Sequence, residues 1–264
     1  MLDHTYKALR TNARNSTTRI LLGMTLALAI FRAIGAQAES PACVDRAFET
    51  SRFKVCAFDA HTQYVRLAWR DALNSPLRSF ARLKPMLGTS EHRVRFAMNA
   101  GMFDAQGTPI GLFVENGHKR VSANLQSGTG NFYLKPNGIF WIGRNQIVSI
   151  ETTEQYVERA REPLWATQSG PMLVIDGALN PQIAPDGPSK YIRNAVGVLD
   201  PQTALFVISD DPVSFGRMAR FFRDALGCRD ALYLDGAVSS LWVPAIDRRD
   251  DQYRLGPMVV VLDR

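Results

Sequence analysis

The sequence contains few of the residues that usually bind metal ions. Its 264 residues include four histidines and three cysteines, and none of them forms a C-x-x-C, H-x-H or H-E-x-x-H pattern. These are patterns in which side chains are spaced to hold zinc or a redox disulfide. A G-x-S-x-G segment, which marks the nucleophile of many serine hydrolases, is also missing. We therefore expect neither a metal nor a cofactor.

The chain has little net positive charge once the N-terminal segment is set aside. The whole chain has a formal net charge of +6, with 31 basic and 25 acidic residues. Residues 1–38 hold five of the basic residues and one acidic residue, so the rest of the chain has 26 and 24 and a net charge of +2. Nucleic-acid-binding proteins usually carry a basic patch. The near-neutral remainder predicts no nucleic-acid partner.

The N-terminal segment has the features of a secretory signal. Four basic residues precede an uncharged run, Ile20–Phe31, and Ala36-Gln37-Ala38 places small residues where a signal peptidase cleaves. Twelve residues span only about 18 Å as a helix, whereas a bilayer core is about 30 Å thick. We predict that residues 1–38 are a cleaved signal peptide, which would place the protein in the periplasm or outside the cell. An uncleaved membrane anchor is the alternative, and no other membrane contact is expected.

Cysteine use agrees with export. Cys43 and Cys56 lie close together in the sequence, and a disulfide between them would hold the start of the mature chain. Cys228 stands alone in an apolar stretch, so we expect it to be a small buried side chain rather than a nucleophile.

Residues 43–264 contain no repeat, low-complexity tract or linker, which predicts one domain. Short runs rich in β-branched and aromatic residues recur along it and are interpreted as strands: 53–58, 64–69, 93–98, 131–134, 138–142, 172–175, 195–199, 204–208, 231–234 and 258–262. Two helices are expected, one starting at Ser75-Pro76 and one at Ser214 with a stop at Gly227. The predicted fold class is α+β, a single β-rich domain with mixed sheets and few helices.

Two segments place polar or small residues at the ends of predicted strands. Asn99 ends the strand 93–98 and is followed by Gly101, which would let a ligand approach the backbone. Ser169-Gly170-Pro171 precedes the strand 172–175. In both cases ordinary turn formation explains the pattern as well as ligand binding does.

Two further segments carry charge. Arg193 precedes an apolar strand and is either a solvated edge residue or a phosphate ligand, for which its guanidinium is well suited. Asp235 follows the strand 231–234 and leads into Gly236 and then Ser239-Ser240. Strand ends often bind ligands, although an Asp-Gly turn capped by serines would look the same.

Taken in order, these segments resemble the phosphodiester glycosidase (uncovering enzyme) domain family, in a bacterial secreted branch. The resemblance covers roughly residues 55–264 and rests on a set of ordered elements: Asn99-Ala100-Gly101-Met102-Phe103, Pro109-Ile110-Gly111-Leu112, 131–138, Ser169-Gly170-Pro171, 193–197 and Leu234-Asp235-Gly236-Ala237-Val238-Ser239-Ser240. Departures include Ala237-Val238, where glycines are common in the family, and Tyr191, where a histidine often stands.

The resemblance implies hydrolysis of a sugar-1-phosphodiester at the anomeric carbon of a carbohydrate or sugar-phosphate substrate. We expect Arg193 to hold the phosphate, with Ser239, Ser240 and nearby backbone amides helping. Asp235 is the candidate nucleophile or base, Asn99 a substrate contact, and Asp210 a second carboxylate. Two alternatives remain: a non-catalytic envelope protein that binds polysaccharide, and a serine hydrolase using Ser169 or Ser239.

Overall fold

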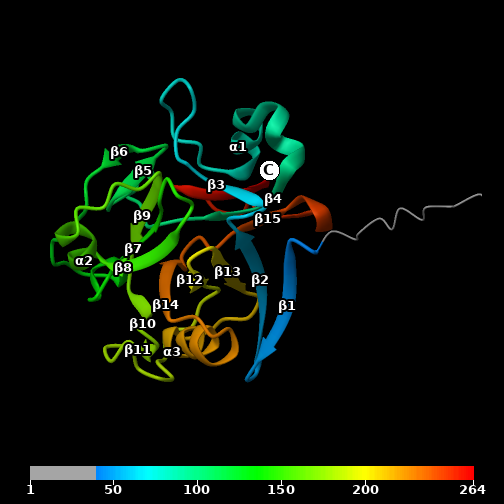
Figure 1. Cartoon of the computed structure of the whole chain (residues 1–264). Coiled ribbons are helices and arrows are strands. Elements are labelled where there is room, and N and C mark those ends of the chain that lie inside the picture. Colours follow the sequence, from blue (N-terminus) through cyan, green and yellow to red (C-terminus); the bar gives the residue numbers. More distant parts are fainter. Residues whose placement is uncertain (1–39) are drawn as a thin grey trace, which may run out of the picture. The chain divides into compact units, whose positions relative to one another are not determined.

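Three antiparallel β-sheets and a few short helices make up residues 40–264, the part of the chain that this computed structural model describes (Figure 1). These residues form one unit. The predicted signal peptide or anchor, residues 1–38, lies outside the described residues. Within residues 40–264, no helix is long and apolar enough to cross a membrane.

The first sheet has seven strands in the order β1-β2-β13-β12-β14-β10-β11. In that order they are Cys43–Phe48, Ser51–Asp59, Thr203–Ser209, Asn194–Asp200, Asp230–Asp235, Met172–Ile175 and Ala178–Leu179. The second sheet has the order β16-β15-β4-β17-β3, with strands Arg248–Arg249, Leu241–Val243, Val94–Asn99, Met258–Asp263 and Gln63–Ala68. The third has the order β6-β5-β9-β7-β8, with strands His118–Val121, Phe113–Glu115, Trp165–Ser169, Gly138–Ile142 and Val148–Thr152.

The helices are short. The α-helices are α1 (Phe80–Leu87), α2 (Thr153–Glu158) and α3 (Phe215–Arg220), and a π-helical turn, η3 (Phe221–Ala225), extends α3. The 3₁₀ turns are η1 (Gly88–Arg93), η2 (Asn131–Tyr133) and η4 (Pro244–Ile246). The predicted α+β class and its β-rich character are confirmed. The strand pairs among residues 40–264 are all antiparallel, so the expected mixture of strand directions is wrong.

Two local predictions also differ from the structure. The run 131–134 forms η2 instead of a strand, because the amides of Tyr133 and Leu134 bond to carbonyls three residues earlier. Helix α1 is capped by Ser79 rather than Ser75, since Ser75 and Leu77 instead form backbone hydrogen bonds with the chain after β3. The second predicted helix does begin after Ser214, whose hydroxyl accepts from Arg217 N, and Gly227 follows it with φ 70°.

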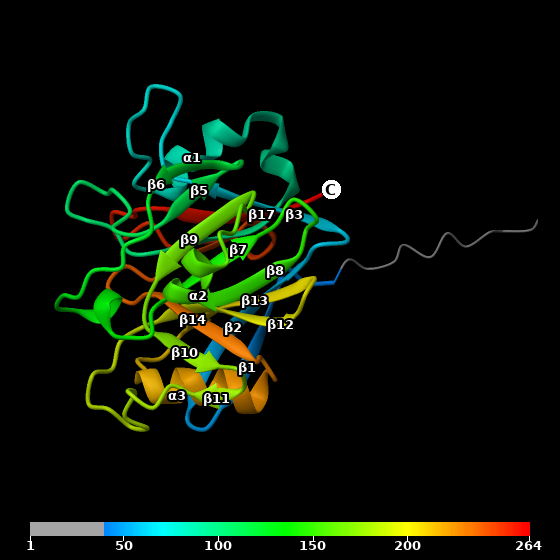
Figure 2. The ribbon, with the colours of Figure 1, turned by 60° about the vertical axis from the view of Figure 1, so that its left-hand side comes forward.

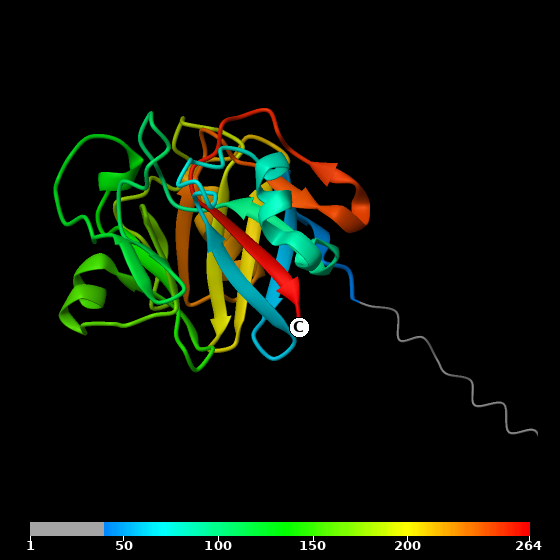
Figure 3. The ribbon, with the colours of Figure 1, turned by 90° about the horizontal axis from the view of Figure 1, so that it is seen from above.

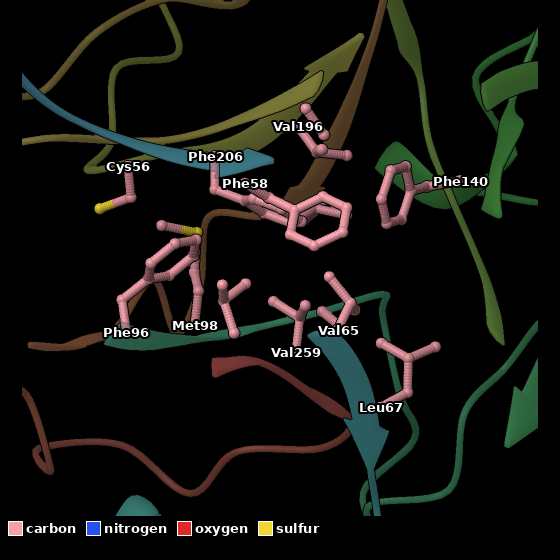
Figure 4. Packing of buried hydrophobic residues seen from close by; sticks show 14 of the residues in the cluster. Cys56, Phe58, Val65, Leu67, Phe96, Met98, Phe140, Val196, Phe206 and Val259 are labelled. Carbon is pink, nitrogen blue, oxygen red and sulfur yellow. The ribbon is translucent and has the colours of Figure 1, made fainter. Parts of the chain in front are cut away.

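The main core lies between the first two sheets. Figure 4 shows Phe58 and Phe206 of the first sheet facing Phe96 and Val259 of the second, with Phe140 of the third sheet closing one side. Seen from above, the red β17 crosses the yellow strands β12 and β13 (Figure 3). This arrangement brings strand ends of the first two sheets together, with Asn99 at the end of β4 and Asp235 at the end of β14. We call this boundary the seam.

Helices cover the outer faces of these two sheets. Helix α1 packs on the second sheet, with the ring centroids of Phe80 and Trp242 6.3 Å apart. On the first sheet, Phe221 of η3 stacks on Phe53 at 4.0 Å. The third sheet stands beside both, as the turned view in Figure 2 shows. Burial on both faces explains the continuously apolar sequences of β13 and β17.

The predicted disulfide is present and joins the paired positions Cys43 and Cys56 of β1 and β2. Cys228 is buried, as expected, and burial raises the pKa of its thiol to about 12.

Replacing both Cys43 and Cys56 with serine should lower the free energy of unfolding by about 2 kcal/mol, because the bond restricts the unfolded chain. Urea denaturation would measure this loss, with Cys228→Ala as the control that leaves the bond intact. An unchanged denaturation midpoint in the double variant would contradict the prediction.

Candidate active site

The predicted site residues Asn99, Arg193 and Asp235 meet at the seam between the first two sheets. Asp235 ends β14 and pairs in register with Asn194, the first residue of β12. Asn99 ends β4 in the second sheet and pairs with Met258 of β17. Residues far apart in the sequence are thus brought together by the ends of strands from two different sheets.

The side chain of Asn194 connects these strand ends, and the sequence analysis did not single it out as a site residue. Its Oδ1 accepts hydrogen bonds from Asn99 Nδ2, the backbone amide of Asp235 and the hydroxyl of Ser239, each at 3.2 Å. Its Nδ2 donates to the carbonyl of Asn99 at 2.8 Å. Asn194 is fully buried. One amide group therefore fixes the positions of three predicted site residues.

Asn99 holds the site together from the second sheet. Its Oδ1 accepts from the backbone amide of Ser240 at 2.9 Å, while its Nδ2 donates to Asn194. The side chain is buried and these bonds use its oxygen and one of its two N–H groups. Its observed contacts are with neighbouring strand ends, so positioning is the role that they support directly.

Asp235 is a buried carboxylate without a cationic partner among residues 40–264. It is 8% exposed, and its Oδ1 accepts from the backbone amide of Ala237 at 2.9 Å. Burial raises the pKa of this carboxyl to about 6, although the amides of Ala237 and Gly236 oppose the shift. A carboxyl group that titrates near neutral pH is suited to proton transfer or nucleophilic attack.

Arg193 lies in the interior, which excludes the solvated edge position. Its Nε donates to Val213 O at 2.8 Å, Nη1 to Tyr233 Oη at 3.1 Å, and Nη2 to the carbonyl and hydroxyl of Ser189. These bonds use four of its five N–H groups and leave one on Nη1. No carboxylate within residues 40–264 pairs with it.

Aromatic rings surround the Arg193 guanidinium instead. Its central carbon lies 3.8 Å from the Phe215 ring centroid, 5.3 Å from Tyr233 and 5.4 Å from Tyr191. Ring faces attract cations without neutralising them. Desolvation lowers the pKa of Arg193. The charge is therefore held in place and remains available to an anion.

Gly236 and Ser239 lie next to these two charged groups. A Cβ atom on Gly236 would be 2.0 Å from Tyr233 Oη and 3.4 Å from Arg193 Nη1, so only glycine fits there without displacement. The Ser239 hydroxyl lies within hydrogen-bond distance of two carbonyl acceptors, Asp235 O at 2.7 Å and Ile192 O at 3.0 Å. The hydroxyl of Ser240 is buried and bonds to Val238 O at 2.8 Å.

Ser169, Gly170 and Gly101 lie where the third sheet adjoins the site. The Ser169 hydroxyl donates to Leu234 O at 2.6 Å, one residue before Asp235. Gly101 packs against Gln168 O, and Gly170 packs against Asn137 and Phe132 O. These close contacts support the packing of the strands. Ser169 and Ser239 both donate to backbone carbonyls, and among residues 40–264 neither has the bond to a histidine that a serine nucleophile needs.

A pocket of about 660 Å³ opens at the seam, and Asp210 lies in its wall. The Asp210 carboxylate accepts from Arg248 Nη1 at 3.1 Å, and Arg248 also pairs with Asp250 at 3.0 Å. The pocket is lined by Lys190, Tyr191, Ile192, Ile208, Ser209, Asp210, Pro212, Gly236, Ala237, Ser239, Arg248, Asp250, Gln252 and Tyr253. Another pocket of about 710 Å³, over α1 and β15, contains none of the predicted site residues. Asp210, Gly236 and Ser239 are the predicted site residues in this lining, and Asp235 and Arg193 adjoin it through their chain neighbours Gly236 and Ile192. We take the seam pocket as the candidate active site.

Comparison with known proteins gives consistent results. The sequence model of the phosphodiester glycosidase family matches residues 92–261. The uncharacterized protein YigE of Escherichia coli (strain K12) is 33% identical over 227 residues, which cover 85% of each chain. The resemblance that the ordered motifs indicated is confirmed.

Two solved structures share the fold. The catalytic domain of zebrafish N-acetylglucosamine-1-phosphodiester alpha-N-acetylglucosaminidase, auto-inhibited by its pro-peptide, aligns with a TM-score of 0.56 at 12% identity, covering 86% of this chain and 85% of that one. A hypothetical protein from Synechocystis aligns with a TM-score of 0.52 at 16% identity, covering 84% of this chain and 61% of that one.

Proposed function

Since the chain belongs to the phosphodiester glycosidase family, we propose that it is an exported hydrolase that cleaves the glycosidic C1–O bond of a sugar-1-phosphodiester. The substrate would be part of an envelope or extracellular glycan or glycolipid. The Cys43–Cys56 disulfide supports the exported location, because such bonds persist in oxidising compartments.

One observation carries this proposal: a buried carboxylate and a buried, unneutralised guanidinium lie at adjoining ends of β14 and β12. Asp235 titrates near neutral pH, and Arg193 keeps one free N–H group on Nη1 beside Gly236. A phosphodiester substrate needs both groups, one for the sugar carbon and one for the phosphate. The pocket next to Gly236 and Ser239 has room for a sugar ring.

In the proposed reaction, the C1–O bond breaks and its electron pair stays on the phosphate oxygen. Asp235 either attacks C1 directly or removes a proton from the water that does so, while Arg193 balances the charge that develops on the phosphate. The oxygen of water ends on C1, and the products are a free sugar and a phosphomonoester. Phosphate is a good leaving group, so little acid assistance is required.

Hydrolysis in ¹⁸O-labelled water tests which bond is cleaved. We expect the purified protein to convert at least one member of a panel of chromogenic sugar-1-phosphodiesters and to place the label on the sugar. Label in the phosphate would mean that the P–O bond is cleaved and would refute the proposal. No turnover across the panel would favour the polysaccharide-binding alternative.

Replacing Gly236 with alanine should lower kcat/KM by roughly ten- to a hundredfold, because the new methyl group must displace the Tyr233 hydroxyl and with it Arg193. Steady-state kinetics on the best substrate of the panel would measure the loss. Gly187→Ala is the matched control, since a Cβ there makes only ordinary contacts. Equal losses in the two variants would argue against a role for the Gly236 backbone.

A further inference from the structure

Arg78 is not part of the pocket lining, and its guanidinium forms no ion pair within residues 40–264. Its Nε and Nη1 are buried and make no hydrogen bond. Buried polar groups are nearly always hydrogen-bonded, so an arginine in this state calls for an explanation. Its backbone is in the left-handed region, with φ 62°, immediately before the Ser79 cap of α1. Such a conformation is unfavourable for arginine and is often kept for function.

A second arginine, Arg254, lies close to Arg78. The amide of the next residue, Leu255, donates to Arg78 O at 2.9 Å, which fixes the two segments side by side. The charge of Arg254 adds to desolvation, the larger cause, in lowering the pKa of Arg78. Arg254 is exposed and forms no ion pair with the described part of the chain. Two like charges thus lie near each other, and neither forms an ion pair within residues 40–264.

Asp104 is the acidic residue that acts on Arg78, but it does so without forming an ion pair. Asp104 favours the charged form of Arg78, but its Oδ1 accepts from the backbone amide of Thr108 at 2.8 Å. No ion pair joins Asp104 to either arginine. The Phe103 ring lies 5.2 Å from the central carbon of Arg78, so the guanidinium is held between an aromatic ring and the turn at Gly107.

The arginine pair is connected to the pocket by the chain itself. Tyr253 lines the pocket, and Arg254 is the next residue of the same loop. Phe103 belongs to the segment that leaves β4 after Asn99. Arg254 is therefore one residue from the pocket lining, and the bond from Leu255 N to Arg78 O brings the two arginine segments together there.

We propose that Arg78 and Arg254 form a second anion-binding site, which takes a phosphate or carboxylate group of the same substrate molecule. The inference rests on the proposed function for the identity of that substrate. It narrows the class to glycans with at least two negative groups, one at the scissile bond and one beyond it. A guanidinium pair suits either anion, because it offers several charge-assisted hydrogen bonds.

Calorimetric titration of the wild-type protein and its variants with inorganic phosphate tests the site directly. We expect the wild-type protein to bind phosphate and Arg254→Gln to bind it about tenfold more weakly. Arg229→Gln removes the same charge from an arginine that is 75% exposed and pairs with Asp176, so it should bind as the wild type does. Arg254 is exposed, so its replacement should not disturb folding. Equal phosphate binding by the two variants would overturn the inference, even in an active enzyme.

Kinetics with paired substrates test whether the second anion belongs to the substrate. The KM for a sugar-1-phosphodiester with an additional phosphate on its leaving group should be about tenfold lower than for the same compound without it. This difference should disappear in Arg254→Gln and persist in Arg229→Gln; persistence in both would overturn the inference. Loss of phosphate binding in Arg254→Gln together with no turnover by the wild type would uphold the anion site and refute the proposed function instead.

Discussion

Replacing Asp235 with asparagine is expected to lower kcat for a sugar-1-phosphodiester by about a thousandfold or more. The amide has nearly the same shape and can still accept the hydrogen bond from Ala237 N. It can neither attack the anomeric carbon nor take a proton from water. Wild-type activity should rise with pH around a midpoint of about 6, where the Asp235 carboxyl ionises.

A matched control exists on the same strand. Asp230 begins β14, and burial raises the pKa of its carboxyl as well, but it accepts from the backbone amide of Asp176 far from the pocket. Asp230→Asn should therefore keep its kcat. If Asp235→Asn and the wild type hydrolyse the substrate equally fast, Asp235 is not catalytic; equal binding of polysaccharide without turnover would favour the binding alternative.

The same replacement should make the protein more stable at alkaline pH. The pKa of Asp235 rises from 3.8 in the unfolded chain to about 6 in the folded protein, so folding disfavours the ionised form. Well below pH 3.8 the group is protonated in both states and no penalty arises. As pH increases from 3.8 to above 6, the wild type loses about 3 kcal/mol of unfolding free energy that Asp235→Asn does not lose.

Denaturant unfolding at pH 4 and pH 8 would measure this difference. Asp235→Asn should be the more stable protein at pH 8, and its advantage should be largely gone at pH 4. Asp211→Asn should change stability in the opposite direction and make the protein less stable than the wild type. The bonds from Arg52 lower the pKa of Asp211 to about 2 and favour its ionised form. A stability advantage of Asp235→Asn that is the same at both pH values would refute the link to ionisation.

Local patterns in the sequence predicted most of the strands that form the site. The alternation in 93–98 and the apolar runs at 204–208 and 258–262 mark β4, β13 and β17 closely. Strand β9, which ends in Ser169, was missed because its residues, Trp165 to Ser169, show no apolar alternation. Its pairing with β5 and β7 defines it, and that pairing depends on residues distant in the chain.

The candidate site was predicted in part for the same reason. Asp235 and Arg193 stand out because a charged residue beside an apolar strand is visible in the sequence. The burial of Arg193 was not predictable, because it depends on the rings of Phe215 and Tyr233. Tyr233 lies 40 residues from Arg193 in the sequence. Asn194 lies in the segment 193–197 that carries the family resemblance, but the sequence assigned it no role. Its bond to Asn99 spans 95 residues, so only the folded chain makes it the common partner of three site residues.

If the proposed function is right, the residues that Asn194 fixes at the strand ends carry the reaction, and the loops around the pocket select the substrate. Asn99, Asp235 and Arg193 are anchored to strand ends, whereas Tyr191 and Tyr253 stand on connecting loops with half-exposed rings. Loops accept substitution and insertion far more readily than buried strand ends. Under the proposed function, homologues would change the substrate by changing the loops around the pocket, while the strand-end residues keep their positions. The same division would let an engineer redirect this scaffold by replacing loops alone.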